Sequence, residues 1–97
     1  MKYVVKVNPL MKDHADQFIK NRRQNIADIR KFLINNDFLE IGKIGHRLKG
    51  VGGSYGFDMV SEIGALIEEA VENRKDRAGI EGLCNKMIEY LDNVELV

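Results

Sequence analysis

The sequence predicts an all-α protein, an antiparallel up-down-up-down four-helix bundle with a short extended N-terminal arm. Four segments of the 97-residue chain carry apolar residues three and four positions apart, the spacing that gathers them on one side of a helix. Short polar breaks separate these segments, which favours antiparallel neighbours. The length suits one domain, which we divide into an arm at residues 1–8 and a helical domain at residues 9–97. A three-helix fold with a long arm is the alternative.

The arm and the start of the first helix follow from residues 1–8 and the single proline. Apolar residues alternate loosely in this stretch, which favours an extended conformation, although an isolated strand needs a partner. Pro9 suits the first turn of a helix, and Asn8 before it is a candidate N-cap. We expect an interruption near Asp13–Asp16 before the helix continues.

Polar residues mark the limits of the first and second helices. Asn21–Asn25 interrupts the apolar side of the first helix, so its register is uncertain there. The break that begins at Asn35 ends with Asp37, a plausible cap for the next helix. We expect that second helix over Phe38–Tyr55, with Gly56 as its C-terminal glycine.

The third and fourth helices are predicted on the same grounds. Asp58 is placed to cap the third helix, which reaches the break at Asn73–Asp76. The fourth helix begins near Arg77, and its apolar spacing continues as far as Val94.

The second helix contains five glycines between positions 42 and 53, and each costs about 1 kcal/mol in a helix interior relative to alanine. In projection, one side is apolar and carries Ile41, Ile44, Leu48, Val51 and Tyr55. The opposite side carries Gly42, Lys43, His46, Lys49, Gly50 and Gly53. The sequence therefore predicts an exposed imidazole on a strip with few side chains, accessible to another macromolecule. Gly45 and Gly52 lie nearer the core edge, where we expect them to let a neighbouring helix approach.

The charges are divided unevenly along the chain. Residues 1–50 carry eleven basic and five acidic side chains, a net charge of +6, whereas residues 51–97 carry four and ten, a net charge of −6. Two explanations remain open: an anionic partner or phosphoryl group binds the basic half, or oppositely charged helices pair within the bundle. Nucleic acid is disfavoured, because aromatic residues do not interleave with the basic ones.

Composition also bears on the environment of the protein. The apolar fraction of 44% and the charged fraction of 31% are typical of a soluble chain. No apolar run is long enough for a membrane span or a secretory signal. Cys84 is the single cysteine, which excludes an internal disulfide, fits the cytoplasm, and is interpreted as a small buried apolar residue.

The segment His46–Gly50 resembles the signature of the histidine-containing phosphotransfer (HPt) domain family. That signature is His-x-Leu-Lys-Gly, then small residues, one bulky apolar residue (here Tyr55) and a glycine ten positions after the histidine (here Gly56). Phe18–Ile26 resembles the first long helix of the family and Leu66–Ala70 its third, so the resemblance covers most of the chain.

The sequence departs from the family pattern within the glycine strip. Val51 stands where the family usually has a small residue, and Gly52 and Gly53 stand where alanine is common. Val51 falls on the core side and should leave His46 accessible, while the glycines should only loosen the helix.

The resemblance implies a phosphocarrier with His46 as phosphoacceptor. In the family, the histidine takes a phosphoryl group from an aspartyl phosphate on a response-regulator receiver domain and passes it to another receiver. Lys49 would partly neutralise the phosphoryl charge, and Gly50 and Gly53 would let the partner approach the backbone. Lys43 would do the same as Lys49 or contact the partner's acidic rim.

The expected chemistry requires neither a general base nor a cofactor from this chain. An unperturbed imidazole, with a pKa of about 6.5, is a largely neutral nucleophile at physiological pH and needs no neighbouring base. We expect no cofactor in this chain, because the receiver supplies Mg²⁺ and a lysine. The expected partners are receiver domains and a sensor or hybrid histidine kinase, with no nucleic acid, no membrane and a monomeric state.

Other functions compete with the phosphorelay carrier. A chemotaxis-type histidine kinase has a similar phosphoacceptor domain, which receives phosphate from ATP at a kinase domain. A natural chain that continues past Val97 into a kinase core would favour this alternative. A start at Met1 instead favours a standalone protein. A module that docks on a receiver without transfer is another candidate. An enzyme is least expected, because His46 has no paired carboxylates, metal-ligand spacing or phosphate-binding loop nearby. His14 lacks the context of His46 and is interpreted as incidental.

Overall fold

The computed structural model describes residues 2–73 and 76–97, most of which are helical. Their elements, in chain order, are β1 (Tyr3–Val5), the 3₁₀ helix η1 (Pro9–His14), α1 (Ala15–Ile34), α2 (Phe38–Val51), the 3₁₀ helix η2 (Gly53–Tyr55), α3 (Asp58–Asn73), α4 (Arg77–Asp92) and β2 (Val94–Leu96). Four long α-helices within these residues agree with an all-α four-helix bundle and exclude the three-helix alternative. None of these helices is long and apolar enough to cross a membrane.

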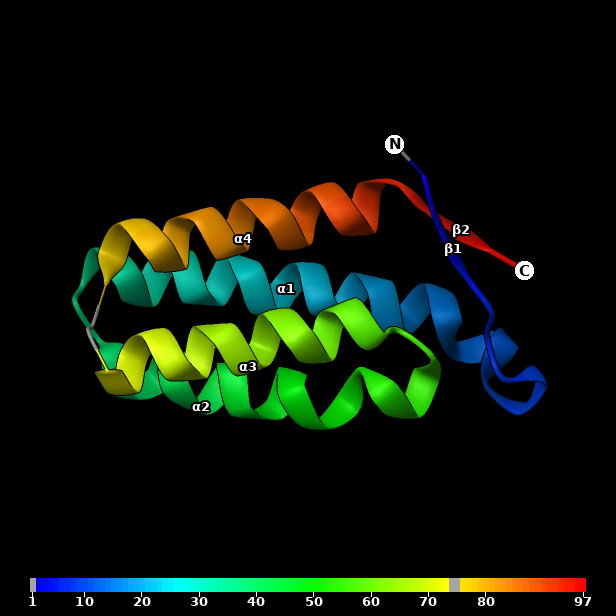
Figure 1. Cartoon of the computed structure of the whole chain (residues 1–97), viewed down its shortest axis with the longest axis horizontal. Helices are drawn as coiled ribbons and strands as arrows, with labels where there is room; N and C mark the ends of the chain where they lie inside the picture. The colour runs from blue at the N-terminus through cyan, green and yellow to red at the C-terminus, as the bar shows by residue number, and fades with distance from the viewer. Residues whose placement is uncertain (1, 74–75) are drawn as a thin grey trace.

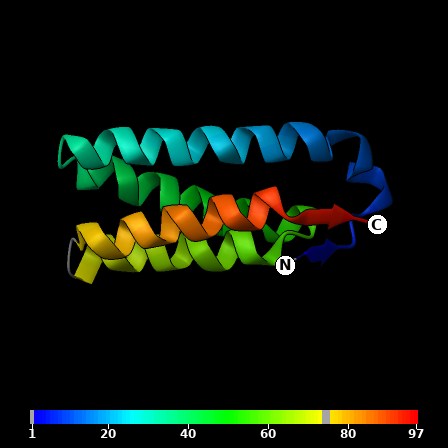
Figure 2. The same cartoon turned by 90° about the horizontal axis from the view of Figure 1, so that it is seen from above.

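The four α-helices lie side by side along the long axis of the molecule, and successive helices connect at alternating ends (Figure 1). In the perpendicular view of Figure 2, both ends of the chain lie near the end of the bundle where α4 stops. The break expected at Asn73–Asp76 follows the end of α3 at Asn73, and residues 74 and 75 lie outside the described part.

Side chains just before three helices satisfy backbone N–H groups that the helix itself leaves unpaired. Asn8, Asp37 and Asp76 each accept a hydrogen bond from an N–H group two or three residues later, at 3.0, 3.4 and 3.1 Å. The expected caps at Asn8 and Asp37 are confirmed. Asp58 differs, because it is the first residue of α3 rather than the residue before it.

The second helix is shorter than predicted. It ends at Val51, and the expected last turn is the 3₁₀ helix η2, which Gly56 terminates in the left-handed region with φ of 87°. At Gly52 a Cβ atom would come within 2.6 Å of the backbone nitrogen of Ser61. The chain therefore passes close to the start of α3 at this glycine, which confirms the close approach expected there.

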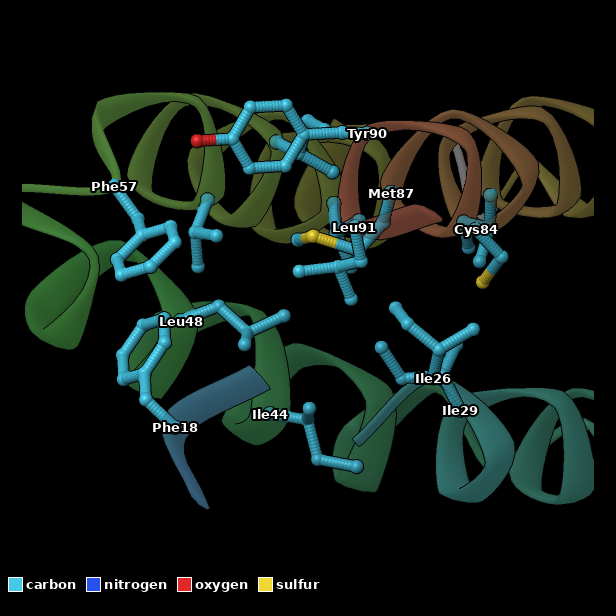
Figure 3. Close-up of a cluster of buried hydrophobic side chains, with 14 of the residues drawn as sticks. Phe18, Ile26, Ile29, Ile44, Leu48, Phe57, Cys84, Met87, Tyr90 and Leu91 are labelled. Carbon is cyan, nitrogen blue, oxygen red and sulfur yellow. The ribbon is translucent and has the colours of Figure 1, made fainter. Parts of the chain in front are cut away.

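The core lies between the four helices and is closed at one end by Phe57 (Figure 3). The Phe57 side chain is fully buried and stacks on Phe18, with ring centroids 4.6 Å apart. Cys84 is buried within this core, as interpreted from the sequence, and burial raises the pKa of its thiol to about 11. The thiol therefore behaves as an apolar packing group.

The two ends of the chain pair with each other. β1 and β2 form a parallel two-stranded ribbon in which Tyr3 lies opposite Val94 and Val5 opposite Leu96. The fourth helix was predicted to include Val94 but ends at Asp92. The Asn93 side-chain amide donates to the Glu89 carbonyl at 2.7 Å, which satisfies the helix end and lets the chain continue as a strand.

Part of the charge asymmetry is compensated inside the bundle. Arg23 of α1 pairs with Asp92 of α4 at 2.6 Å, and Arg30 lies 3.9 Å from Glu81. These pairs support the explanation that oppositely charged helices face each other.

The terminal ribbon should contribute measurably to stability. Val5 is 5% exposed, whereas Val4 on the other side of the strand is 66% exposed. We expect Val5→Ala to lower the free energy of unfolding by about 2 kcal/mol, because buried methyl groups are lost. Val4→Ala, the matched control, should change it by less than about 0.5 kcal/mol. Urea denaturation measures both values, and equal values would show that the ribbon does not pack on the core.

Candidate functional site

His46 lies on α2 with its side chain directed away from the core. The imidazole is 72% exposed, whereas Ile44 and Leu48 on the same helix are buried. The exposure predicted from the helical projection is therefore present in the structure.

Glu68 of α3 fixes the orientation of the exposed ring. Its Oε2 atom lies 2.8 Å from Nδ1 of His46, and the Glu68 side chain itself is only 20% exposed. A carboxylate can only accept a hydrogen bond, so Nδ1 is the nitrogen that donates one. In the neutral ring, Nε2 then has no proton and carries a free lone pair.

The same carboxylate holds a lysine. Nζ of Lys49 lies 3.6 Å from Oε1 of Glu68. The partly buried Glu68 carboxylate therefore contacts both the histidine and the lysine one turn later. Lys43 is directed elsewhere, because its Nζ atom pairs with Glu40 at 3.3 Å. The structure therefore brings Lys49 to the histidine through Glu68 and gives Lys43 a different partner.

Two glycines bring Glu68 within reach of His46. A Cβ atom on Gly64 of α3 would lie 2.5 Å from the backbone nitrogen of Lys49, and one on Gly45 would lie 3.0 Å from that of Glu68. The helices α2 and α3 therefore pack backbone against backbone at this crossing. The close approach expected at Gly45 is confirmed, and Gly64 is the partner that sequence analysis missed.

The strip beyond His46 is open. A Cβ atom on Gly50 would meet nothing within 4 Å, and one on Gly53 would only reach Ser61 Oγ at 3.9 Å. Gly42, expected on the same open side, instead faces Val71 of α3 at 3.4 Å. The uncovered backbone is thus confined to the C-terminal side of the histidine.

The N-terminal side of the histidine is a groove between α2 and α3, with a volume of about 630 Å³. Its floor and walls are largely apolar and include Phe38, Leu39 and Val71, and Leu39 is 70% exposed. Glu40 and Glu72 add acidic groups to its lining, and Lys43 and Arg47 add basic ones. Within residues 2–73 and 76–97, no cluster of three or more potential ligands is arranged to hold a metal ion.

Glu68 was not identified from the sequence. It lies within Leu66–Ala70, the segment that resembles the third helix of the family, directly beside Glu69. The apolar spacing of this helix places both carboxylates outside the core and does not show which one turns toward α2. Only the helix crossing at Gly64 distinguishes them.

One known protein family matches most of the chain. The family model of the Hpt domain matches residues 14–96, which include all four helices, His46 and Glu68. The chain belongs to the Hpt domain family. Hpt domains are phosphocarrier modules of two-component signalling, which transfer phosphoryl groups through a histidine in phosphorelays and interact there with receiver domains and kinases. No curated protein and no solved structure matches the chain significantly.

Alanine substitutions at Gly64 and Gly50 of this Hpt domain should change the free energy of unfolding in opposite directions. Gly64→Ala should lower the free energy of unfolding by about 2–3 kcal/mol, because the added methyl group collides with the α2 backbone. Gly50→Ala should raise it by up to about 1 kcal/mol, because alanine favours the helix and meets no neighbour. Chemical denaturation measures both, and a tolerated Gly64→Ala would show that the helices are not in backbone contact.

The hydrogen bond of Glu68 should set the histidine tautomer. In the wild type, ¹⁵N NMR of neutral His46 should show the proton on Nδ1. Glu68→Ala removes the acceptor, so the Nδ1–H population should fall. Glu69→Ala, one residue along the same helix, is the matched control and should leave the tautomer unchanged. An Nε2–H ring in the wild type would contradict the assigned hydrogen bond.

Proposed function

We propose that His46 is the phosphoacceptor of this Hpt domain. It would accept a phosphoryl group from the aspartyl phosphate of a receiver domain and pass it to another receiver in a multistep phosphorelay. The observation that supports this proposal best is the exposed ring whose Nδ1 is occupied by Glu68. Nε2 is thereby the nitrogen available to a partner.

The transfer would use the lone pair of Nε2. It attacks the phosphorus atom, a new N–P bond forms, and the P–O bond to the aspartate breaks as the aspartate leaves as a carboxylate. Positive charge develops on the imidazole as the N–P bond forms. The Nδ1 proton stays on the ring, and its hydrogen bond to Glu68 stabilises that charge. No proton has to leave the histidine, so no general base is required.

Lys49 would support the phosphoryl group. Its ammonium group lies beside the histidine but is held at 3.6 Å from Glu68, a long ion pair on an exposed side chain. Such a pair is weak, so the lysine can turn toward a phosphoryl group on Nε2 at little cost. Mg²⁺ and the remaining positive charge would come from the receiver domain, and this chain would act as a carrier and not as an enzyme.

The glycines would serve access, and Lys43 would contact the partner. Gly50 and Gly53 leave backbone uncovered beyond His46, so a receiver can approach this side of α2 without meeting side chains. Lys43 already pairs with Glu40, which favours a role at the edge of the interface over one at the phosphoryl group.

Substitution of each of the two histidines tests this function. When the protein is mixed with a phosphorylated receiver, radiolabel should move to the wild type and to His14→Gln, and none should move to His46→Gln. The protein-bound phosphate should be acid-labile, as expected for phosphohistidine. Phosphate transfer and gel autoradiography measure these outcomes.

The competing functions predict different results in the same assay. A module that only docks would bind the receiver without taking label. Label on His46→Gln would show that another residue is the acceptor. A domain fed by a kinase would take label from ATP and a kinase domain but not from any phosphorylated receiver.

A further inference from the structure

Arg22 is a cation at a core-facing position of α1. It lies four residues after Phe18 and four before Ile26, both of which are buried, so the three side chains project from the same side of the helix. A charged group that loses water at such a position normally has an anionic partner. Arg22 is only half-buried, but it is the one residue of this stripe that carries a charge.

The Arg22 side chain is held by neutral contacts. Its guanidinium carbon lies 4.7 Å from the centroid of the Phe18 ring, and its Nε atom donates to Asn25 Oδ1 at 2.8 Å. Neither contact neutralises the charge. Burial lowers the pKa of Arg22; the nearby Tyr55 acts in the opposite direction, and the positive charge of Arg47 lowers that pKa further. The guanidinium is therefore fixed in position close to a second cation.

Neither arginine has a carboxylate partner in the described part of the chain. Arg23 and Arg30, on the same helix as Arg22, pair with acidic residues of α4. No such pair forms at Arg22 or at Arg47, which is exposed and directly follows His46. The basic excess that remains after pairing within the bundle therefore includes Arg22 of α1 and Arg47 of α2, the residue next to the histidine.

The charges around His46 differ in whether they are paired. The groove between α2 and α3 is lined by Glu40, Glu68 and Glu72 and also by Lys43 and Arg47. Glu40 pairs with Lys43, and Glu68 with His46 and Lys49, whereas Arg22 and Arg47 have no carboxylate partner among the described residues. An acidic surface that approaches His46 would therefore be attracted to these two arginines.

We propose that Arg22 and Arg47 form a docking site for carboxylates of the receiver domain that exchanges phosphate with His46. This inference rests on the proposed function, because it names how the partner of the same site is held. The partner has the required chemistry, because carboxylates hold the Mg²⁺ beside its phosphorylated aspartate and make that surface acidic. A guanidinium binds carboxylates through two parallel hydrogen bonds. Since Phe18 and Asn25 already fix Arg22, little side-chain entropy is lost on docking.

The site should act on encounter with the partner and leave the chemical step unchanged. We expect Arg22→Gln/Arg47→Gln to lower the second-order rate constant of transfer about tenfold and to flatten its dependence on salt. The limiting rate at saturating receiver should remain that of the wild type. Arg47→Gln alone, at an exposed position where the side chain has no hydrogen bond or ion pair with the described residues, should show the same pattern with a smaller change.

The experiment uses receiver domains phosphorylated with acetyl phosphate, and transfer to the full chain is followed against receiver concentration at two salt concentrations. Lys20→Gln/Lys31→Gln is the matched control. It removes the same charge from exposed positions on the side of α1 away from the core, so its rate constant should change by less than about twofold.

Failure of this inference can be told apart from failure of the proposed function. If none of the receivers labels the wild type, the phosphoacceptor function itself fails. If the wild type is labelled and the double arginine variant has the same concentration and salt dependence, only the docking site is wrong. If the variant instead changes the hydrolysis half-life of the phosphorylated protein without receiver, the arginines bind the phosphoryl group, which also overturns docking.

Discussion

The backbone contact between α2 and α3 is the constraint on which the site depends. Gly45 and Gly64 leave no side chain between the two helices, and a single methyl group at Gly64 would already overlap with α2. Glycine is unfavourable in a helix by about 1 kcal/mol, but close packing of the two helices offsets this loss. The same contact brings a carboxylate of α3 beside a histidine of α2. A wider crossing would leave the imidazole without its acceptor.

The site combines exposure with order, two properties that usually oppose each other. An exposed side chain normally rotates freely, and holding it still costs conformational entropy. Here the outer part of the His46 ring faces solvent while its inner nitrogen is bound to a carboxylate that is itself mostly buried. Because the Glu68 carboxylate is partly buried, solvent ions screen its interaction with the ring less than they would for a fully solvated carboxylate. Glu68 therefore holds the ring more firmly.

Local patterns predicted the parts of the fold that local interactions determine. Asp37 and Gly56 were identified from their types and positions, and the exposure of His46 followed from helical spacing alone. Local sequence patterns failed where contacts between distant parts of the chain determine the structure. Val94 continues the apolar spacing of the fourth helix, yet it is drawn into a strand by Tyr3, which lies at the other end of the sequence. Glu68 and Glu69 are equivalent in sequence, and only the crossing at Gly64 separates them. The register of the first helix could not be read from the apolar spacing because Arg22, a charged residue, occupies a core-facing position.

The parallel ribbon links the folding of the domain to the order of its synthesis. β1 precedes the four long helices in the chain, and its only strand partner in the described residues, β2, follows them. Val5 and Val7 are buried in the finished protein, but they have no partner strand until residues 94–97 leave the ribosome. The helices, whose contacts are largely between neighbours in sequence, can associate before then. Closure of the ribbon is therefore a late event, and a nascent chain would expose this apolar segment to chaperones until translation has passed α4.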